Sequence, residues 1–78
     1  MAGLSRREEY KQMLRLLRAA RKAAGLSQIQ AAEALGETQI FISKVERGER
    51  RIDPVELARF AKLYGVEVAD LIPRDPVE

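Results

Sequence analysis

The sequence predicts a small all-α protein, a compact domain of five helices. Helix-capping signals recur along the chain, apolar residues follow helical spacing, and glycines stand where helices would end, whereas strand signals are few. A chain of 78 residues is most simply one domain, 1–78, with one small core. Because domains near this size bury only about 60% of the surface that the unfolded chain exposes, we expect a homodimer to add stability.

The first helix is marked by a capping box. Ser5 and Glu8 form the S-x-x-E pattern, in which each side chain accepts a hydrogen bond from the other residue's backbone N–H, so the helix should begin near Arg6. Gly25 is placed to end it, because glycine tolerates the left-handed conformation that closes helices. The residues at helical spacing between these limits are Tyr10, Met13, Leu14, Leu17 and Ala24.

Two short helices are predicted next. Ser27 and Gln30 form a second capping box, and Gly36 ends that helix. Thr38 begins the following helix, and Gly48 stops it. The two helices are expected at about 28–35 and 38–47. Their inward residues are predicted to be Ala31, Ala32 and Leu35 on the first, and Thr38, Ile42 and Val45, which cluster within about 60°, on the second.

The last third of the chain predicts two more helices. Asp53 and Glu56 form a D-x-x-E capping box, and Pro54 suits the first turn because its missing N–H costs nothing there. Gly65 ends this helix, whose buried residues are predicted to be Leu57, Phe60, Ala61 and Tyr64. A final short helix is expected at about 68–72, ended by Pro73.

Composition argues against several classes of protein. The chain has no cysteine and no histidine, which removes disulfides, thiolate nucleophiles, the commonest general base and the commonest metal ligands. The remaining carboxylates, lysines and hydroxyls form no recognisable catalytic set, so we expect no enzyme, metal or cofactor. No apolar run approaches the roughly 18 residues of a membrane span, and the N-terminus lacks the apolar centre of a signal peptide. A cytoplasmic protein is therefore expected.

Charge is distributed unevenly along the chain. Residues 1–24 carry seven Lys and Arg against two Glu, whereas residues 52–78 carry three against six Asp and Glu. This gradient suggests that one side of the domain faces an anion while the C-terminal side faces away, toward a partner subunit. Ordinary solvated helix faces would give the same counts, and charge alone favours that simpler interpretation.

The middle of the chain carries the most specific pattern. Residues 28–47 are "QIQAAEALGETQIFISKVER". A small residue, a glycine and two apolar residues specify two helices packed closely across a tight turn, namely Ala32, Gly36, Ile42 and Val45. This pattern resembles the helix-turn-helix of the lambda-repressor and Cro class, specifically the Xre-like regulators of bacteria and phages. The segments "LRAARKAAGLSQ", "ISKVERGERRID" and "LARFAKLYGVEVADL" extend the resemblance over about residues 14–71.

The resemblance implies that the second motif helix lies in the DNA major groove with its N-terminal residues at base edges. Gln39 would contact bases first, since glutamine pairs with adenine N6 and N7 together. Ile40 lies about 160° from Ile42 around the helix and should contact a thymine methyl. Lys44 would either contact guanine O6 and N7 or bind a phosphate. Phe41, on the flank, would either be half-buried or contact a base.

Other polar residues are implied to bind DNA phosphates at the start of the first motif helix and around the second: Ser27, Gln28, Thr38, Ser43, Arg47, Arg50 and Arg51. Ser27 and Thr38 are also explained as helix caps, and both roles can hold together. The three arginines stand beside Glu46 and Glu49, so the cluster could instead be solubilising charge. We favour phosphate binding for Arg47 and leave the two loop arginines open.

Members of this family usually pair an arginine in the first helix with a glutamate in the second motif helix. This assigns Arg21 and Glu46 to a structural ion pair rather than to catalysis. The chain departs from the family at Ala20 and Ala31, where larger aliphatic residues are common. Packing there is expected to be looser or to be filled by other side chains, namely Met13, Ile29 or Phe41.

The leading hypothesis is a transcription regulator that binds a pseudo-palindromic operator in double-stranded DNA as a homodimer. It would regulate transcription by occluding or recruiting RNA polymerase. A phage-type repressor, an antitoxin and a restriction-system controller are not separated by the sequence. The dimer surface is expected on the C-terminal helices, where apolar residues exceed the needs of the core: Val66, Val68, Leu71, Ile72 and Val77. The alternative is a protein-interaction module with Ile40 and Phe41 as an apolar patch.

Overall fold

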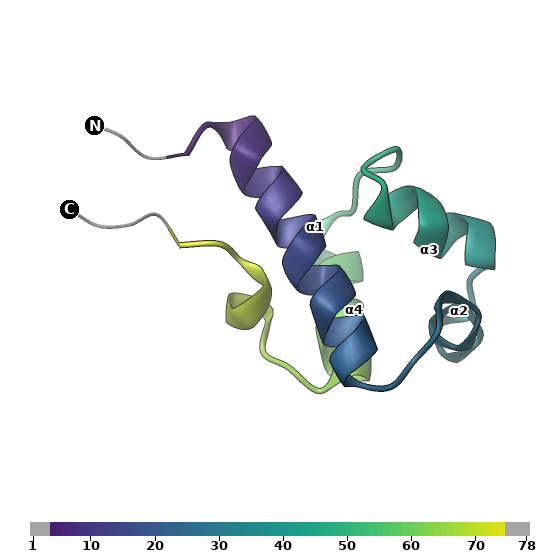
Figure 1. Ribbon diagram of the computed structural model, residues 1–78. Helices are drawn as coiled ribbons and strands as arrows, with labels where there is room; N and C mark the ends of the chain where they lie inside the picture. Colours follow the sequence, from purple (N-terminus) through teal and green to yellow (C-terminus); the bar gives the residue numbers. More distant parts are fainter. Residues whose placement is uncertain (1–3, 75–78) are drawn as a thin grey trace.

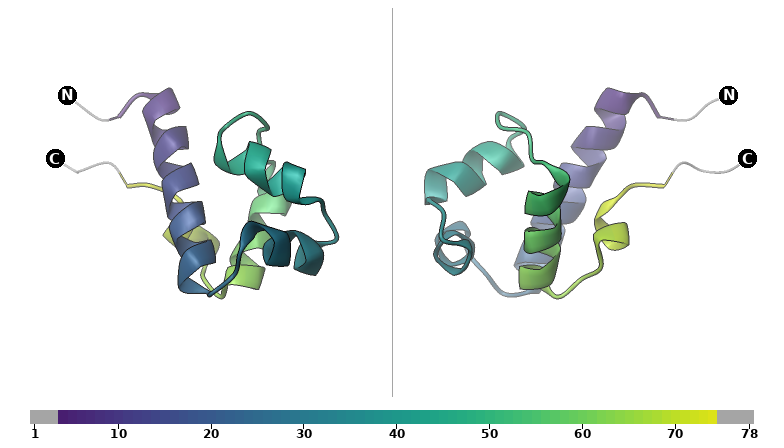
Figure 2. Two further views of the ribbon diagram at one scale, coloured as in Figure 1. Left: turned by 45° about the vertical axis from the view of Figure 1, so that its right-hand side comes forward. Right: turned by 180° about the vertical axis from the view of Figure 1, so that it is seen from behind.

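The computed structural model describes residues 4–74, which form four α-helices and one turn of 3-10 helix, without a strand. The elements are α1 (Arg6–Ala23), α2 (Gln28–Leu35), α3 (Gln39–Glu46), α4 (Pro54–Tyr64) and η1 (Val68–Leu71). In Figure 1, α1 crosses the molecule diagonally, with α2 and α3 on one side of it and η1 on the other. Figure 2 shows from behind that α4 packs between α1 and the α2–α3 pair. None of the described helices is long and apolar enough to cross a membrane.

The predicted capping boxes are present, and α1, α2 and α4 begin directly after their first residues. Ser5 Oγ accepts from the Glu8 N–H at 3.1 Å while Glu8 Oε1 accepts from the Ser5 N–H at 2.9 Å, and α1 begins at Arg6. The boxes at the starts of α2 and α4 are also complete. Gly65 ends α4 with φ 74°. Ala24, expected on the buried side of α1, is instead its exposed C-cap.

The predicted all-α class is correct, but the fifth helix is only a 3-10 turn. Four residues separate Glu67, which precedes η1, from Ile72, whose backbone is extended before Pro73. A segment this short has little room for an α-helix. The residue before a proline is also biased away from helical dihedrals, which prevents extension of the helix through Ile72. The C-terminal element is therefore shorter than expected.

The core lies where α1, α2, α3, α4 and η1 meet. Its largest fully buried side chains are Leu17, Ile42, Val45, Phe60 and Leu71. Thr38, expected to face inward with Ile42 and Val45, is exposed, because its hydroxyl caps α3 by accepting from the Phe41 N–H at 3.0 Å. Ile29 does not compensate for Ala31, since its side chain is 59% exposed, whereas Met13 is buried.

The apolar residues expected to form a dimer surface separate into two groups. Leu71 is 1% exposed and belongs to the core of its own chain, so it is not available to a partner. Val66 also packs partly against that core. Val68 and Ile72 remain exposed, and Val77 lies outside the described residues. The exposed apolar surface at this end is thus smaller than the sequence suggested.

Tyr64 carries a buried hydroxyl for which residues 4–74 provide no hydrogen-bond partner. Burial raises the pKa of this hydroxyl to about 12. A buried, unpaired donor costs about 1–3 kcal/mol. We therefore expect Tyr64→Phe to raise the free energy of unfolding by about 1 kcal/mol at neutral pH, measured by urea denaturation. A loss of stability in this variant would instead show that the hydroxyl has a partner.

The same group predicts a loss of stability in alkali. Below pH 10 the hydroxyl is protonated in both states, whereas between pH 10 and 12 the unfolded chain loses this proton and the folded chain keeps it. The free energy of unfolding should therefore fall by about 3 kcal/mol across that interval, at about 1.4 kcal/mol per pH unit. Tyr64→Phe should lack this part of the decline, so the difference between the two proteins should grow with pH.

Candidate nucleic-acid interface

α2 and α3 form a compact pair joined by a three-residue turn. Gly36 ends α2 in the left-handed conformation with φ 69°, which lets the chain turn without a Cβ clash. Ala31 and Ala32 are 0% and 3% exposed, so their small side chains allow the two helices to approach closely. Arg59, on α4, donates to the Leu35 carbonyl at 2.8 Å and holds the end of α2. The orientation of α3 relative to α2 is therefore set by close packing.

One side of α3 is exposed and carries polar side chains around a single large apolar one. Ile42 and Val45 are fully buried, as predicted, whereas Ile40 is 64% exposed. The other residues on the outward side are Gln39, at the start of α3, and Ser43, Lys44 and Arg47, which follow it by four, five and eight residues. This outward side is the α3 face. It combines hydrogen-bonding groups, positive charge and one apolar contact.

Arg21 and Glu46 form the predicted ion pair between α1 and the end of α3. Arg21 Nε lies 2.6 Å from Glu46 Oε2, and Arg21 Nη2 donates to Oε1 at 3.1 Å. The two side chains are only 7% and 5% exposed. Arg21 Nη1 also donates to the Leu26 carbonyl at 2.8 Å, and the hydrogen bonds that Arg21 donates to Glu46 raise the pKa of Arg21. The guanidinium is thus well satisfied despite its burial.

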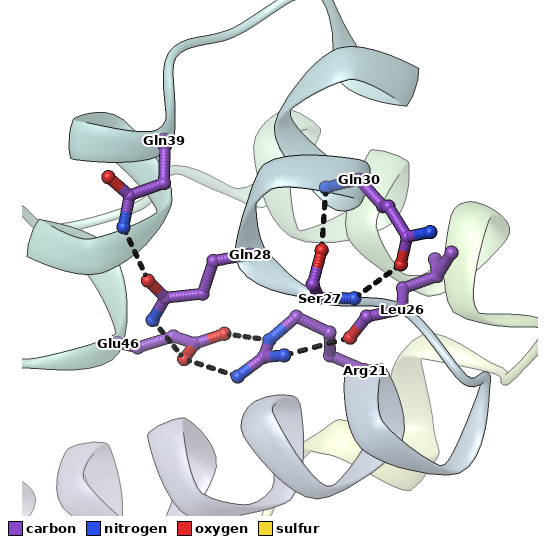
Figure 3. A network of polar contacts seen from close by, with 7 residues as sticks. All are labelled: Arg21, Leu26, Ser27, Gln28, Gln30, Gln39 and Glu46. Carbon is purple, nitrogen blue, oxygen red and sulfur yellow. Dashed lines mark hydrogen bonds and ion pairs between the residues drawn. The ribbon is translucent and has the colours of Figure 1, made fainter.

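The ion pair continues into a chain of glutamines that reaches the α3 face (Figure 3). Gln28 Nε2, from the first turn of α2, donates to Glu46 Oε1 at 3.0 Å. Gln39 Nε2 in turn donates to Gln28 Oε1 at 2.8 Å. Three helices therefore hold one exposed amide, that of Gln39. The sequence did not indicate this contact, because its partners are eleven residues apart on different helices.

The start of α2 offers polar groups to solvent. Ser27 Oγ caps the helix by accepting from the Gln30 N–H at 3.0 Å. This cap uses one first-turn N–H, and the first turn of any helix has further N–H groups without an intrahelical partner. Together with the positive end of the helix dipole, these groups favour an anion.

Each of the three arginines after α3 contacts an acidic or aromatic side chain of the same chain. Arg47 donates from Nε to Glu49 Oε2 at 3.0 Å and also donates to the Ser43 hydroxyl. This ion pair raises the pKa of Arg47 and lowers that of Glu49, but both side chains are 54% exposed. Such exposed ion pairs contribute little to the stability of the fold. Arg47 can therefore exchange Glu49 for another anion with a small loss of free energy.

Each loop arginine lies over an aromatic ring. Arg50 Nη1 is 3.0 Å from Glu56 Oε1, and the Arg50 guanidinium is 4.6 Å from the centre of the Phe41 ring. The Arg51 guanidinium is 4.2 Å from the centre of the Tyr10 ring on α1. These contacts order the loop, and the one from Arg50 joins it to Phe41 in the first turn of α3.

Phe41 occupies the half-buried position, one of the two alternatives. Its ring stacks on that of Phe60 with centroids 6.3 Å apart and planes inclined by 2°. The ring is therefore partly packed against α4 and the core. Ile40, unlike Phe41, has no such tertiary support.

The geometry defines a helix-turn-helix domain, in which a short second helix is presented on two supporting helices. Residues 17–71 match the helix-turn-helix family. The chain belongs to this family, within its Xre-like branch. The sequence resemblance to Xre-like regulators is thereby confirmed.

Solved structures show the same relationship. An Xre-family-like protein from Pseudomonas syringae pv. tomato str. DC3000 is 40% identical, with a TM-score of 0.78, over 83% of this chain and 79% of that one. The DNA-binding domain of BldD is 35% identical, with a TM-score of 0.75, over 85% and 96%. The S. venezulae BldD DNA-binding domain is also 35% identical, with a TM-score of 0.74, over 85% and 99%. No curated protein matches the sequence.

Proposed function

We propose that this protein is a sequence-specific DNA-binding transcription regulator that places α3 in the major groove. The observation that carries the proposal is the α3 face, on which Gln39 is held by Gln28 and through it by the buried Arg21–Glu46 pair. A base-contacting amide gains from being held in place, because less side-chain freedom is lost on binding. The similarity to domains described as DNA-binding supports the same function.

Base contacts are proposed for the first two turns of α3. Gln39 presents an amide suited to adenine, and Ile40 presents an apolar group suited to a thymine methyl. Lys44, one turn further along, contacts guanine or a phosphate. Phe41 is not proposed as a base contact, because its own ring is stacked on Phe60.

Phosphate contacts are proposed on both sides of α3. Ser27, Gln28 and the free N–H groups of α2 form one set, and Thr38 and Ser43 add hydroxyl donors. Arg47 forms the other set, since its exposed pair with Glu49 is readily exchanged. The proposed contribution of Arg50 and Arg51 is to order the loop and add positive charge.

The proposed regulator acts in the cytoplasm as a homodimer on a pseudo-palindromic operator, with its two α3 helices about 34–36 Å apart. Val68 and Ile72, exposed at the C-terminal end, provide apolar groups for the subunit contact. Bound in this way, the protein would block or contact RNA polymerase. The alternative of an apolar interaction patch is less well supported, because Phe41 is half-buried and leaves Ile40 alone.

The test is fluorescence anisotropy on random and selected duplexes across a salt series. The logarithm of the binding constant should fall linearly with the logarithm of salt concentration, with a slope of about −0.9 per phosphate contact. Selected duplexes should bind more tightly than random ones at every salt concentration. Absence of any binding at low salt would remove the proposed function.

Ile40→Ala should weaken binding to a selected duplex by about 1 kcal/mol per half-site, roughly fivefold, because the thymine methyl loses its apolar partner. Stability should change by less than about 0.5 kcal/mol, since the side chain is exposed. Replacing the contacted thymine with deoxyuridine should remove the difference between the two proteins.

Val55→Ala is the matched control for Ile40→Ala. Val55 lies on α4 and is 70% exposed, so its truncation should affect neither binding nor stability. A clear loss of stability in Ile40→Ala would place Ile40 in the core, and unchanged affinity would remove its DNA contact.

A further inference from the structure

A positively charged cleft lies between the first turns of α1 and the loop that follows α3. Both segments lie at the same end of the molecule, at the top of Figure 1. The cleft measures about 540 Å³, within the range of ligand-binding pockets. Five of the residues that line it are cationic and the others are aromatic, aliphatic or glycine: Arg6, Arg7, Lys11, Arg47, Arg51, Tyr10, Leu14 and Gly48.

The positive charge of this basic cleft is poorly neutralised. Among the residues that the structure describes, no acidic side chain lines the cleft. Within residues 4–74, Arg6, Arg7 and Arg51 form no ion pair, and Arg51 stacks instead on Tyr10. Arg47 alone is paired, with Glu49, and that pair is half-exposed. Like charges brought together in this way repel one another unless an anion binds between them.

The position of Arg6 and Arg7 adds to this electrostatic cost. Both lie in the first turn of α1, where the positive end of the helix dipole disfavours cations and favours anions. Local helix stability therefore does not explain two consecutive arginines here. An anion in the cleft would be attracted by these side chains, while the helix end itself is capped by Ser5 and Glu8.

Apart from the buried Arg21, the remaining cations of α1 differ from those of the cleft. Arg15 and Arg18 are exposed along the helix, and Lys22 lies in the last turn, where the dipole favours it. None of the three lines the basic cleft. They match the α1 cations of the cleft in number and type, so they provide an internal comparison between solubilising charge and a binding site.

We propose that the basic cleft binds two or more neighbouring phosphate groups. Several guanidinium groups around one cleft suit phosphate oxygens, because each offers donors in a planar fork, and five cations exceed what one phosphate needs. The phosphates belong either to the DNA backbone or to a free polyphosphate chain. Arg47 lies in both the cleft and the α3 face, so the cleft continues the proposed path of the DNA. If the phosphates are those of the DNA backbone, the proposal rests on the proposed function. If they belong to a free polyphosphate chain, it does not.

The test compares two triple variants of the full chain. The cleft variant carries Arg6→Gln, Arg7→Gln and Lys11→Gln, and the control variant carries Arg15→Gln, Arg18→Gln and Lys22→Gln. Each loses three positive charges from α1, so a general effect of net charge should be equal in both. Thermal unfolding by circular dichroism establishes that both are folded before binding is measured.

The first measurement is calorimetric titration with sodium tripolyphosphate at low salt, without DNA. The second is the salt dependence of binding to a random-sequence duplex. If the cleft takes free phosphates, the affinity of the cleft variant for tripolyphosphate should fall at least about tenfold while the control keeps its affinity. If it takes the DNA backbone, the salt slope should become shallower by about one for each phosphate that is no longer bound, in the cleft variant alone.

The proposal is overturned if the two triple variants behave alike in both measurements. That result would leave the proposed function standing, provided that the unaltered protein binds DNA. If the unaltered protein fails to bind any duplex at low salt, the proposed function fails instead. The tripolyphosphate titration alone then tests whether the cleft binds phosphate groups.

Discussion

Glu46→Ala is expected to lower the free energy of unfolding by about 3–5 kcal/mol, because it leaves the buried Arg21 guanidinium without its counter-charge. The loss is large for a 78-residue domain, whose total stability is on the order of 5–15 kcal/mol. The melting temperature should fall by at least about 12 °C, at about 4 °C or more per kcal/mol. Urea denaturation and thermal unfolding, each followed by circular dichroism, measure the two quantities.

Glu49→Ala is the matched control, because Glu49 forms an arginine pair of similar length on the surface. That variant should lose far less stability than Glu46→Ala, because solvent-exposed ion pairs contribute little to stability. Removing both partners, with Arg21→Met and Glu46→Met, should recover much of the stability, since no unpaired charge is left buried. If Glu46→Ala were as stable as Glu49→Ala, the structural role of the buried pair would be wrong.

Gln39→Ala is expected to weaken binding to a selected duplex by about 1–3 kcal/mol per half-site, roughly 5-fold to 150-fold. The reason is the loss of paired hydrogen bonds to one adenine, so random duplexes should be bound as before. The ratio between selected and random affinities is therefore the quantity to measure, by anisotropy at one fixed salt concentration.

Two further variants distinguish base contact from side-chain positioning and from phosphate contact. Gln28→Ala removes the side chain that holds Gln39 and should lower the same ratio by a smaller factor, because Gln39 itself is kept. Arg47→Ala should weaken selected and random duplexes alike, as expected of a phosphate contact. If Gln39→Ala lowered both affinities equally, Gln39 would be a backbone contact and not a base contact.

Much of the local structure was predictable because it depends on neighbours in the chain. The starts of α1 and α4 follow from capping boxes whose two residues are three positions apart, and the ends of α2 and α4 follow from single glycines. The prediction was less accurate for η1, where a proline and a short segment left room for only one 3-10 turn. The position of Phe41 was undecided, because a flank residue is buried only if another helix covers it, as Phe60 of α4 does here.

The sequence by itself determined the helical class, the caps, the close α2–α3 turn, and the separation of buried Ile42 from exposed Ile40, because each depends on spacing within one or two helices. Only the tertiary structure decided that Gln28 joins Glu46 to Gln39, and that the start of α1 meets the loop after α3 in a basic cleft. These features join side chains from separate helices. Such contacts depend on how the helices pack, and periodicity along one helix does not specify that packing.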